Sequence, residues 1–226
     1  IYIYPSRADF EAEAKAWEFR PTVGVRWLEL DADELRQREP ELDRRYTFGV
    51  MVEEGGHCTD PGAYTAALVA HAVGQGATQL RARATGFAIE AGRLKAVRTD
   101  QGDVAADAAV IAAGAFARPL AAAAGDAVPL ETERGYHAMV ADAEVGPRTP
   151  MMPYDGKMSI TWTDRGLRCA GQVEIAGLEA APNWKRAEIL RDRLVSCFPG
   201  LPRDLPASRV KVWMGHRPSM PDGKPC

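Results

Sequence analysis

Arg217, near the C-terminal end of the sequence, has the surroundings of a site for a small acid. It stands in the segment SRVKVWMGHRPS, which has the pattern of a strand, directly after His216 and four residues after Trp213. A guanidinium group presents a planar fork of donors that suits a carboxylate, and small-molecule pockets combine a few such polar groups with aromatic walls. The segment predicts a carboxylate site at Arg217, with a solvated or structurally paired arginine as the alternative.

Two further segments carry residues that a small-molecule site would use. The strand-like segment ETERGYHAMV contains the polar pair Tyr136 and His137. In VIAAGAFARPLA an apolar strand runs into a turn of small residues around Gly114 and then into a helix. Gly114 has no side chain, so a ligand can approach the backbone closely there. Close packing of the strand on the helix would explain the small residues equally well.

Other kinds of chemistry find no support in the sequence. No serine lies in a G-x-S-x-G turn, so Ser/His/Asp catalysis is not predicted. The one G-x-G, at 74–76, ends a helix and lacks the third glycine of a phosphate-binding turn. The histidines show no H-E-x-x-H and no pairing with cysteine, so no metal site is predicted. They are His57, His71, His137 and His216.

The composition is that of a folded protein without a nucleic-acid or membrane-spanning segment. The chain has 226 residues, 46% of them hydrophobic, and a net charge of -3, which leaves no basic footprint for nucleic acid. No apolar run approaches the roughly 20 residues that cross a bilayer. The cysteines have no regular spacing, which favours free thiols in a reducing cytoplasm over a disulfide framework. They are Cys58, Cys169, Cys197 and Cys226.

The hydrophobic periodicity predicts the elements that must position these residues. Helices are expected over 6–20, 31–40, 57–77 and 182–200, with Ser6, Asp31, and Thr59 or Asp60 as N-caps of the first three. Strands are expected over 1–4, 24–30, 46–54, 128–141, 149–164, 166–175 and 208–219, and as a run within 78–114 with turns at 91–92 and 101–102.

Two of these expectations concern the sheets. The segment 108–114 is apolar on both faces and is expected as a central strand. The four strands from 128 onward are expected to form an antiparallel sheet. The helix over 182–200 is expected to cover that sheet with Trp184, Ile189, Leu190 and Leu194.

Taken together, the segments resemble the FAD-dependent D-amino acid oxidase superfamily, in particular its bacterial D-amino acid dehydrogenase branch. They follow the order of that family across essentially the whole chain. The matching stretches are ELDADELRQREPEL, EEGGHCTDPGAYTAAL, ADAAVIAAGAFARPLA, VPLETERGYHAMV, LRCAGQVEIAGLEAAPNWKRAEIL and MGHRPSMPDGKP.

The resemblance implies an α/β (α+β) fold in which part of a FAD-binding domain is interleaved with an antiparallel-sheet substrate domain. It assigns 1–48 and 126–212 to the substrate domain and 49–125 to the FAD domain. Residues 213–226 would begin the return of the chain to the FAD domain. Family members also have a G-x-G-x-x-G unit before these segments and further strands after them. The resemblance therefore indicates an internal fragment.

The resemblance also assigns roles to residues. Arg217 matches the arginine that pairs with the substrate carboxylate, and Ala84 matches a strand residue near the adenine side of FAD. Tyr136, His137 and His216 match positions of the branch that we expect to contact substrate. The turn that would lie against FAD comprises Ala113, Gly114, Ala115 and Phe116, with Phe116 where tryptophan is usual. No residue stands out as a catalytic base.

The implied reaction is oxidative deamination of a small D-amino acid, or of a related secondary amine of the D-proline type, by hydride transfer to FAD. The product is an imine or the 2-oxo acid derived from it. The electron acceptor is oxygen or a membrane quinone, so the protein is expected in the cytoplasm or peripherally at the inner membrane. Because the phosphate loop is missing, the alternative is a truncated, non-catalytic module that binds a small acid or a partner chain.

Overall fold

The computed structural model describes residues 1–224, which fall into two compact units. Unit 1 comprises Ile1–Tyr64, Gly135–Val173 and Pro182–Met214; unit 2 comprises Thr65–Arg134, Glu174–Ala181 and the chain from Gly215 onward. The chain passes between the units several times. The assignment of 1–48, 49–125 and 126–212 to substrate and FAD domains concerns function and stays a prediction.

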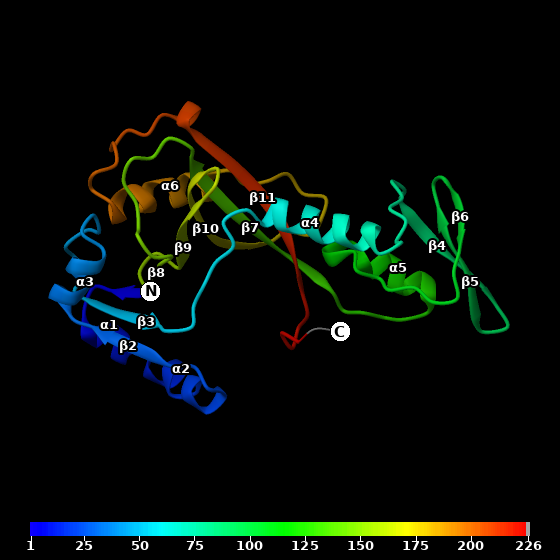
Figure 1. Cartoon of the computed structure of the whole chain (residues 1–226), viewed down its shortest axis with the longest axis horizontal. Helices are drawn as coiled ribbons and strands as arrows, with labels where there is room; N and C mark the ends of the chain where they lie inside the picture. Colours follow the sequence, from blue (N-terminus) through cyan, green and yellow to red (C-terminus); the bar gives the residue numbers. More distant parts are fainter. Residues whose placement is uncertain (225–226) are drawn as a thin grey trace. The chain divides into compact units, whose positions relative to one another are not determined.

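Unit 1 begins with a small sheet and the helices around it (Figure 1). The strand order is β2 (Trp27–Leu30), β3 (Phe48–Val52), β1 (Tyr2–Tyr4) and β8 (Met152–Pro153). β1 pairs antiparallel with β3 and parallel with β8. The helix α3 (Ala32–Arg38) carries the predicted N-cap, because Asp31 accepts hydrogen bonds from the backbone N–H groups of Asp33 and Glu34, and Glu34 bonds back to the N–H of Asp31.

The helix predicted over 6–20 is wrong as a single helix. The chain forms α1 (Arg7–Glu11) with Ser6 as its N-cap, α2 (Ala14–Glu18) and the 3₁₀ turn η1 (Arg20–Val23). The break at residues 12–13 lets Phe10 and Trp17 both pack on Tyr4, in a buried aromatic cluster that also contains Phe48. The Trp17 indole N–H donates to the Tyr4 hydroxyl at 3.0 Å, so packing of aromatic side chains overrides the helical periodicity.

A second sheet has the strand order β11 (Val210–Ser219), β7 (Glu131–Val140), β10 (Gly166–Ile175) and β9 (Met158–Thr163). β9 and β10 pair antiparallel, with Thr163 opposite Gly166. The unit boundaries cross β7, β10 and β11. In unit 1, residues of β7, β9 and β10 join α6 (Lys185–Cys197) in the main hydrophobic core.

The buried face of α6 corrects the prediction in part. Its buried residues are Ala187, Leu190, Leu194 and Cys197, whereas Ile189 is 42% and Trp184 is 44% exposed. The spacing of three to four residues places the first four on one stripe, and Ile189 lies one residue off it. Trp184 precedes the helix, and its ring meets the edge of the Tyr136 ring instead.

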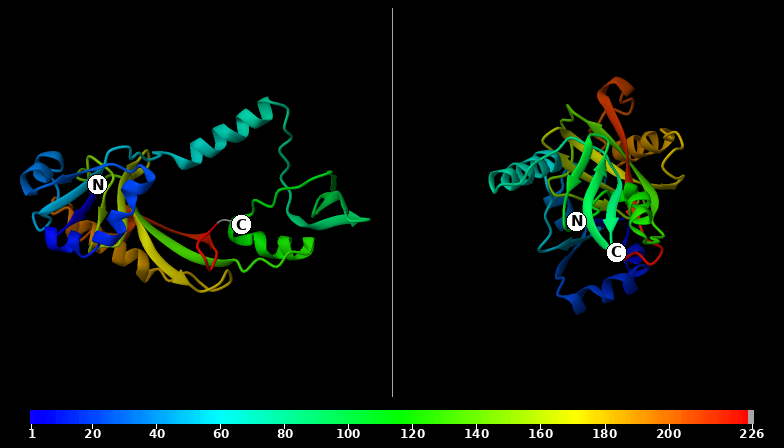
Figure 2. Two further views of the ribbon diagram at one scale, coloured as in Figure 1. Left: turned by 90° about the horizontal axis from the view of Figure 1, so that it is seen from below. Right: turned by 90° about the vertical axis from the view of Figure 1, so that its right-hand side faces the viewer.

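Unit 2 contains a three-stranded sheet of β4 (Ala84–Glu90), β5 (Arg93–Thr99) and β6 (Gly102–Ala105), in that order (Figure 2). The predicted turn at 91–92 is confirmed, with φ of +49° at Ala91 and +73° at Gly92, as a tight hairpin turn requires. The 3₁₀ turn η2 (Gly114–Phe116) leads into α5 (Ala117–Ala124), which packs beside β4 and ends at Gly125 with φ of +101°.

Two apolar segments of the chain lie uncovered. The predicted strand 108–114 is wrong: residues 108–113 have no regular structure, and Val110 is 92% exposed. A strand that is apolar on both faces is stable only between neighbouring strands, and in the part of the chain that the structure describes none pairs with it. The helix α4 (Pro61–Gly74), capped by Asp60, one of the two predicted N-caps, likewise has no buried residue.

Candidate substrate and flavin site

Arg217 lies on β11, in its part that belongs to unit 2, and its side chain is exposed. The two sides of Arg217 are fastened to β7. Nδ1 of His216 lies 3.0 Å from the hydroxyl of Thr132, and the hydroxyl of Ser219 donates to the Glu133 carboxylate at 3.0 Å. Successive residues of a strand face opposite sides, so these contacts hold the strand around Arg217 from both faces.

His216 also meets the turn that the sequence assigns to FAD. The rings of Phe116 and His216 lie 5.8 Å apart in an edge-to-face arrangement. Phe116 is 57% exposed and Ala115 is buried. Unit 2 therefore brings together His216 and one of the predicted flavin-side residues. Ala84, at the start of β4, is exposed and lies opposite Thr99.

His137 takes part in a different cluster, within unit 1. Its imidazole stacks on the Trp213 ring at 5.2 Å, and Nε of Arg168 donates to its Nδ1 at 3.3 Å. Burial, together with the charge of Arg168, lowers the pKa of His137 from 6.5 to about 4. The ring is therefore neutral at pH 7 and carries its proton on Nε2.

Tyr136 faces the hydrophobic core of unit 1. The side chain is 1% exposed, and its hydroxyl accepts a hydrogen bond from the backbone N–H of Asn183 at 3.0 Å. The expected contacts of Tyr136, His137, His216 and Arg217 with substrate stay predictions.

Arg134 is the most deeply buried charged side chain of unit 2, and it was not among the predicted site residues. Its guanidinium group is fully buried and donates to the backbone carbonyls of Gly177, Ala181 and Ala176 at 2.9, 3.3 and 3.4 Å. The Glu174 carboxylate lies 3.7 Å away. Arg134 thus fastens the loop 174–181 to β7. A sign of this role was available, since the run ETER, with three charged residues, opens a strand whose remaining residues are mostly apolar.

The cysteines of the described residues are free, as predicted. Cys58 is exposed, whereas Cys169 and Cys197 are buried. Burial raises the pKa of both buried thiols, so they stay protonated at neutral pH and are poor nucleophiles. Cys226 lies outside the described residues. In residues 1–224 no three His, Cys, Asp or Glu side chains gather as metal ligands, and none of the helices there has the length and apolarity to cross a membrane.

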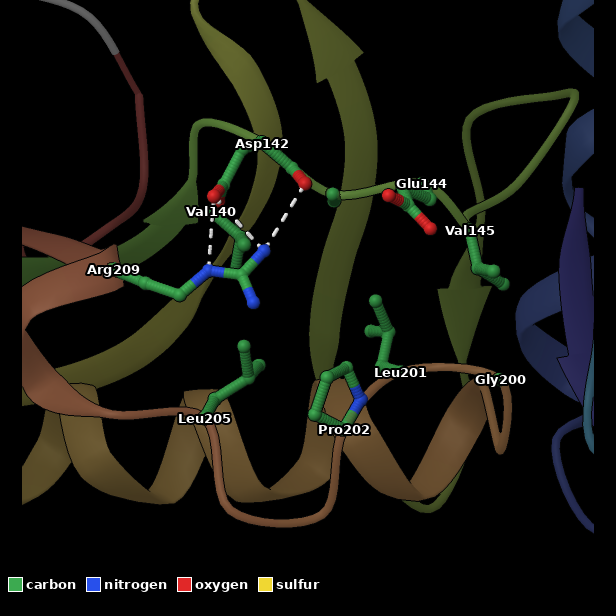
Figure 3. A pocket seen from close by; sticks show the side chains of 10 residues that line it. Val140, Asp142, Glu144, Val145, Gly200, Leu201, Pro202, Leu205 and Arg209 are labelled. Carbon is green, nitrogen blue, oxygen red and sulfur yellow. Dashed lines mark hydrogen bonds and ion pairs between the residues drawn. The ribbon is translucent and has the colours of Figure 1, made fainter.

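A small pocket in unit 1 lies apart from all the predicted site residues (Figure 3). Its apolar walls include Val145, Leu201 and Leu205. At its mouth Arg209 is engaged by Asp142, with Nε 2.9 Å from Oδ2 of the carboxylate. The guanidinium group of Arg209 is thus held by Asp142 at the pocket.

Comparison with known proteins identifies the family. The model of the family "FAD dependent oxidoreductase" matches residues 1–226, the whole chain. The chain belongs to this family. Its members are FAD-dependent enzymes, so the predicted resemblance and the predicted cofactor are confirmed at the level of the family.

Individual relatives agree with this assignment. The D-amino-acid oxidase of Bradyrhizobium diazoefficiens is 61% identical over the whole chain, which covers 53% of that protein. A D-amino acid dehydrogenase of Cereibacter sphaeroides is 32% identical, again over the whole chain and 52% of that protein. The chain spans about half the length of the curated relatives it matches.

Solved structures confirm the predicted fold class. A glycine oxidase from Geobacillus kaustophilus matches 99% of the chain with a TM-score of 0.81 at 20% identity, and the chain covers 60% of it. An L-proline dehydrogenase from P. horikoshii matches 99% of the chain with the same TM-score and identity, and the chain covers 62% of it. The mixed arrangement of helices and several sheets is thus shared with the matched part of these two structures.

The residues of unit 2 fit one side of a flavin. Gly114 has φ of +54°, and no atom lies within 4 Å of the place where a Cβ would stand, so a flat ring can approach the backbone of the turn 113–116. The exposed ring of Phe116 offers an apolar edge beside it. The described residues contain no glycine-rich turn before a helix for the pyrophosphate.

Proposed function

We propose that the protein to which this chain belongs oxidises a small D-amino acid, or a related secondary amine of the D-proline type, with FAD. The product is an imine, which water converts to a 2-oxo acid and ammonia when the substrate is a primary amine. The observation that carries this proposal is the 61% identity to a D-amino-acid oxidase over the whole of the chain.

In this proposal Arg217 binds the substrate carboxylate. Two parallel N–H···O bonds from its guanidinium group fix both the position and the plane of the carboxylate. The bonds of His216 to Thr132 and of Ser219 to Glu133 hold the strand on either side of Arg217, which limits the freedom that this part of the strand must lose when the substrate binds. Orientation of this kind contributes about 7–11 kcal/mol to rate acceleration in favourable cases.

Bound FAD supplies the redox chemistry, as acceptor of the hydride from the α-carbon. The turn 113–116 would lie against it, with Gly114 allowing close approach and Phe116 beside the ring. The α-amino group must be neutral when the hydride leaves, so a bound ammonium group loses a proton to solvent before that step. The chain's contribution is to bind, orient and desolvate the substrate.

The electron acceptor that we propose is oxygen. Support comes from the higher identity to a protein named an oxidase than to those named dehydrogenases, 61% against 32% or less among the relatives compared. A membrane quinone, with the protein held peripherally at the inner membrane, is the competing acceptor. Oxygen consumption in the absence of any added acceptor distinguishes the two.

The test uses a hybrid holoenzyme in which this chain replaces the matching stretch of the Bradyrhizobium oxidase. The replacement is well defined, because the alignment covers the whole of the 226-residue chain at 61% identity. We expect a yellow protein that oxidises small D-amino acids in strong preference to the L-enantiomers. A FAD-loaded hybrid that oxidises no D-amino acid would overturn the proposal and favour the non-catalytic alternative.

Replacing Arg217 by lysine tests the role of its side chain. A lysine keeps the charge but cannot form the two parallel bonds. Loss of a hydrogen bond between charged groups corresponds to about 1.5–3 kcal/mol, so we expect KM for D-alanine to rise by about 10- to 100-fold. The matched control is Arg165→Lys, in the exposed turn between β9 and β10. An unchanged KM in Arg217→Lys would remove Arg217 from the site.

A further inference from the structure

A carboxylate lies beside Arg217 on the same face of the sheet. Arg217 and Ser219 are two residues apart on β11 and project from one face. Because the Ser219 hydroxyl bonds to the Glu133 carboxylate at 3.0 Å, Glu133 of the neighbouring strand β7 shares that face. Thr132, the residue before Glu133, bonds to His216 on the opposite face.

These two bonds fix how far Glu133 is from Arg217. The bond from Thr132 joins β7 to His216, the residue before Arg217. The bond at Glu133 joins β7 to Ser219, the second residue after Arg217. Glu133 is therefore directly opposite Arg217 or one diagonal step away. Such cross-strand neighbours have Cβ atoms about 5–8 Å apart, within reach of long side chains. A glutamate and an arginine at this separation can contact two groups of one small molecule.

The Glu133 carboxylate also lacks a cationic partner. It is half-buried, and within residues 1–224 no lysine, arginine or histidine nitrogen lies within 4.0 Å of it. Its hydrogen bond from Ser219 engages Oε1 and leaves Oε2 to accept another. A half-buried carboxylate with one neutral donor is poorly compensated for its lost hydration. A cationic ligand would supply the missing partner.

We propose that Glu133 binds the α-ammonium group of the substrate while Arg217 binds its α-carboxylate. This inference rests on the proposed function and names a specificity-determining residue for it. The pair is complementary to the zwitterion that every free amino acid carries. It also distinguishes amino acids from 2-hydroxy acids and simple carboxylates, which have no ammonium group to offer.

The pair would also set the choice of enantiomer. Once the carboxylate and the nitrogen are anchored, the two remaining substituents of the α-carbon are the hydrogen and the side chain. They exchange places between the D- and L-forms, so only one enantiomer can direct its Cα–H bond toward the flavin side. With Arg217 alone as anchor, the substrate could rotate about the bond between its carboxylate and the α-carbon, and the selection would weaken.

The experiment compares glycine with acetate in the hybrid holoenzyme described above. Both ligands carry a carboxylate, and only glycine carries the ammonium group. Their dissociation constants are measured anaerobically from the change they cause in the absorbance of the bound FAD. In the variant Glu133→Gln we expect the glycine Kd to rise by about 10- to 100-fold, as for the loss of a charge-assisted hydrogen bond. The acetate Kd should stay within about twofold.

Two control variants separate recognition from support of the strand. Glu131→Gln changes an exposed carboxylate two residues earlier on β7 and should leave both constants within about twofold. Ser219→Ala removes the bond to Glu133 but keeps its carboxylate, so it should change the glycine Kd by no more than about threefold. In steady-state assays, Glu133→Gln should also lower the ratio of kcat/KM for D-alanine to that for L-alanine by about tenfold.

Each other outcome counts against the inference. An unchanged glycine Kd in Glu133→Gln would show that the carboxylate does not meet the ammonium group. Three outcomes would show that Glu133 only supports β11. In the first, Glu133→Gln weakens glycine and acetate binding equally. In the second, Glu133→Gln does not fold or does not bind FAD, and in the third, Ser219→Ala weakens glycine binding as much as Glu133→Gln does. If the unmodified hybrid bound glycine but oxidised no amino acid, the proposed function would fail. The glycine and acetate titrations would still decide the role of Glu133.

Discussion

The two units differ in how far they bury their apolar residues. Unit 1 buries its apolar residues: Leu190 and Leu194 of α6 and Ile160 of β9 are fully inaccessible. Unit 2 contains α4 from Thr65 onward, and no residue of this helix is buried. Leu68 on α4 is 53% exposed and Val110 is 92% exposed. The same kinds of side chain are thus core residues in one unit and surface residues in the other.

The comparison shows which parts of the chain are held by packing and which by local structure. An isolated helix of 14 residues is marginal in water, because nucleation is costly and most helical stability in proteins comes from packing. In the described residues α4 depends on its Asp60 cap and its own hydrogen bonds. Burial in unit 1 is therefore expected to supply most of the free energy of unfolding of this chain.

The largest test of this comparison is a pair of leucine truncations. Leu194→Ala in unit 1 removes a fully buried side chain and should lower the free energy of unfolding by about 2–5 kcal/mol. Leu68→Ala on α4 should change it by less than about 0.5 kcal/mol. Urea unfolding followed by tryptophan fluorescence measures the first, since all five tryptophans lie in unit 1, and circular dichroism measures the second. If both substitutions lowered the free energy of unfolding equally, the two units would not differ in how much packing stabilises them.

Arg134 is the strongest exception in unit 2, and its replacement sharpens the comparison. Arg134→Met keeps much of the buried volume but leaves three carbonyls without the donor they have in Arg134, and it removes a positive charge 3.7 Å from the Glu174 carboxylate. We expect local opening of the loop 174–181 to become easier by about 2–3 kcal/mol. Hydrogen exchange of the amides in this loop measures the change. Arg118→Met, at an exposed position of α5, is the control. Unaltered exchange in Arg134→Met would show that the loop is held by other contacts.

A smaller effect is expected from the titration of His137 in unit 1. The pKa is about 4 in the folded protein and near 6.5 in the unfolded chain, so between these values the unfolded chain binds more protons. Stability is therefore full above about pH 6.5 and is lost as the pH falls toward 4. After allowance for partial solvent screening we expect a loss of about 1–2 kcal/mol. Urea midpoints between pH 7 and 4.5 measure it.

The variant His137→Gln should flatten that pH dependence, because it removes the titrating group. His71→Gln, on the exposed face of α4, should leave the dependence as it is in the unmodified chain. If the free energy of unfolding fell equally with pH in His137→Gln and in the unmodified chain, the loss of stability would belong to other titrating groups.

Much of the secondary structure could be predicted because its signals are local. The capping box at Asp31 and Glu34, the turn at Ala91 and Gly92, and the cap at Asp60 depend only on neighbours in sequence. The predictions failed where distant residues decide. The helix over 6–20 breaks because Phe10 and Trp17 both pack on Tyr4, and 108–114 needs sheet neighbours that its own sequence cannot supply.

The features of the candidate site likewise fall into those that depend on local sequence and those that depend on distant residues. The sequence by itself determined that an arginine with a fork of donors stands at the end of a strand, and that a turn of small residues around Gly114 permits close approach of a ligand. Only the tertiary structure decided which partners these residues have. Three sets of hydrogen bonds join segments that are more than 40 residues apart in the sequence. They are the bonds of Thr132 to His216, of Ser219 to Glu133 and of Arg134 to the loop 174–181. Strand pairing creates such neighbours, and no periodicity within one segment records them.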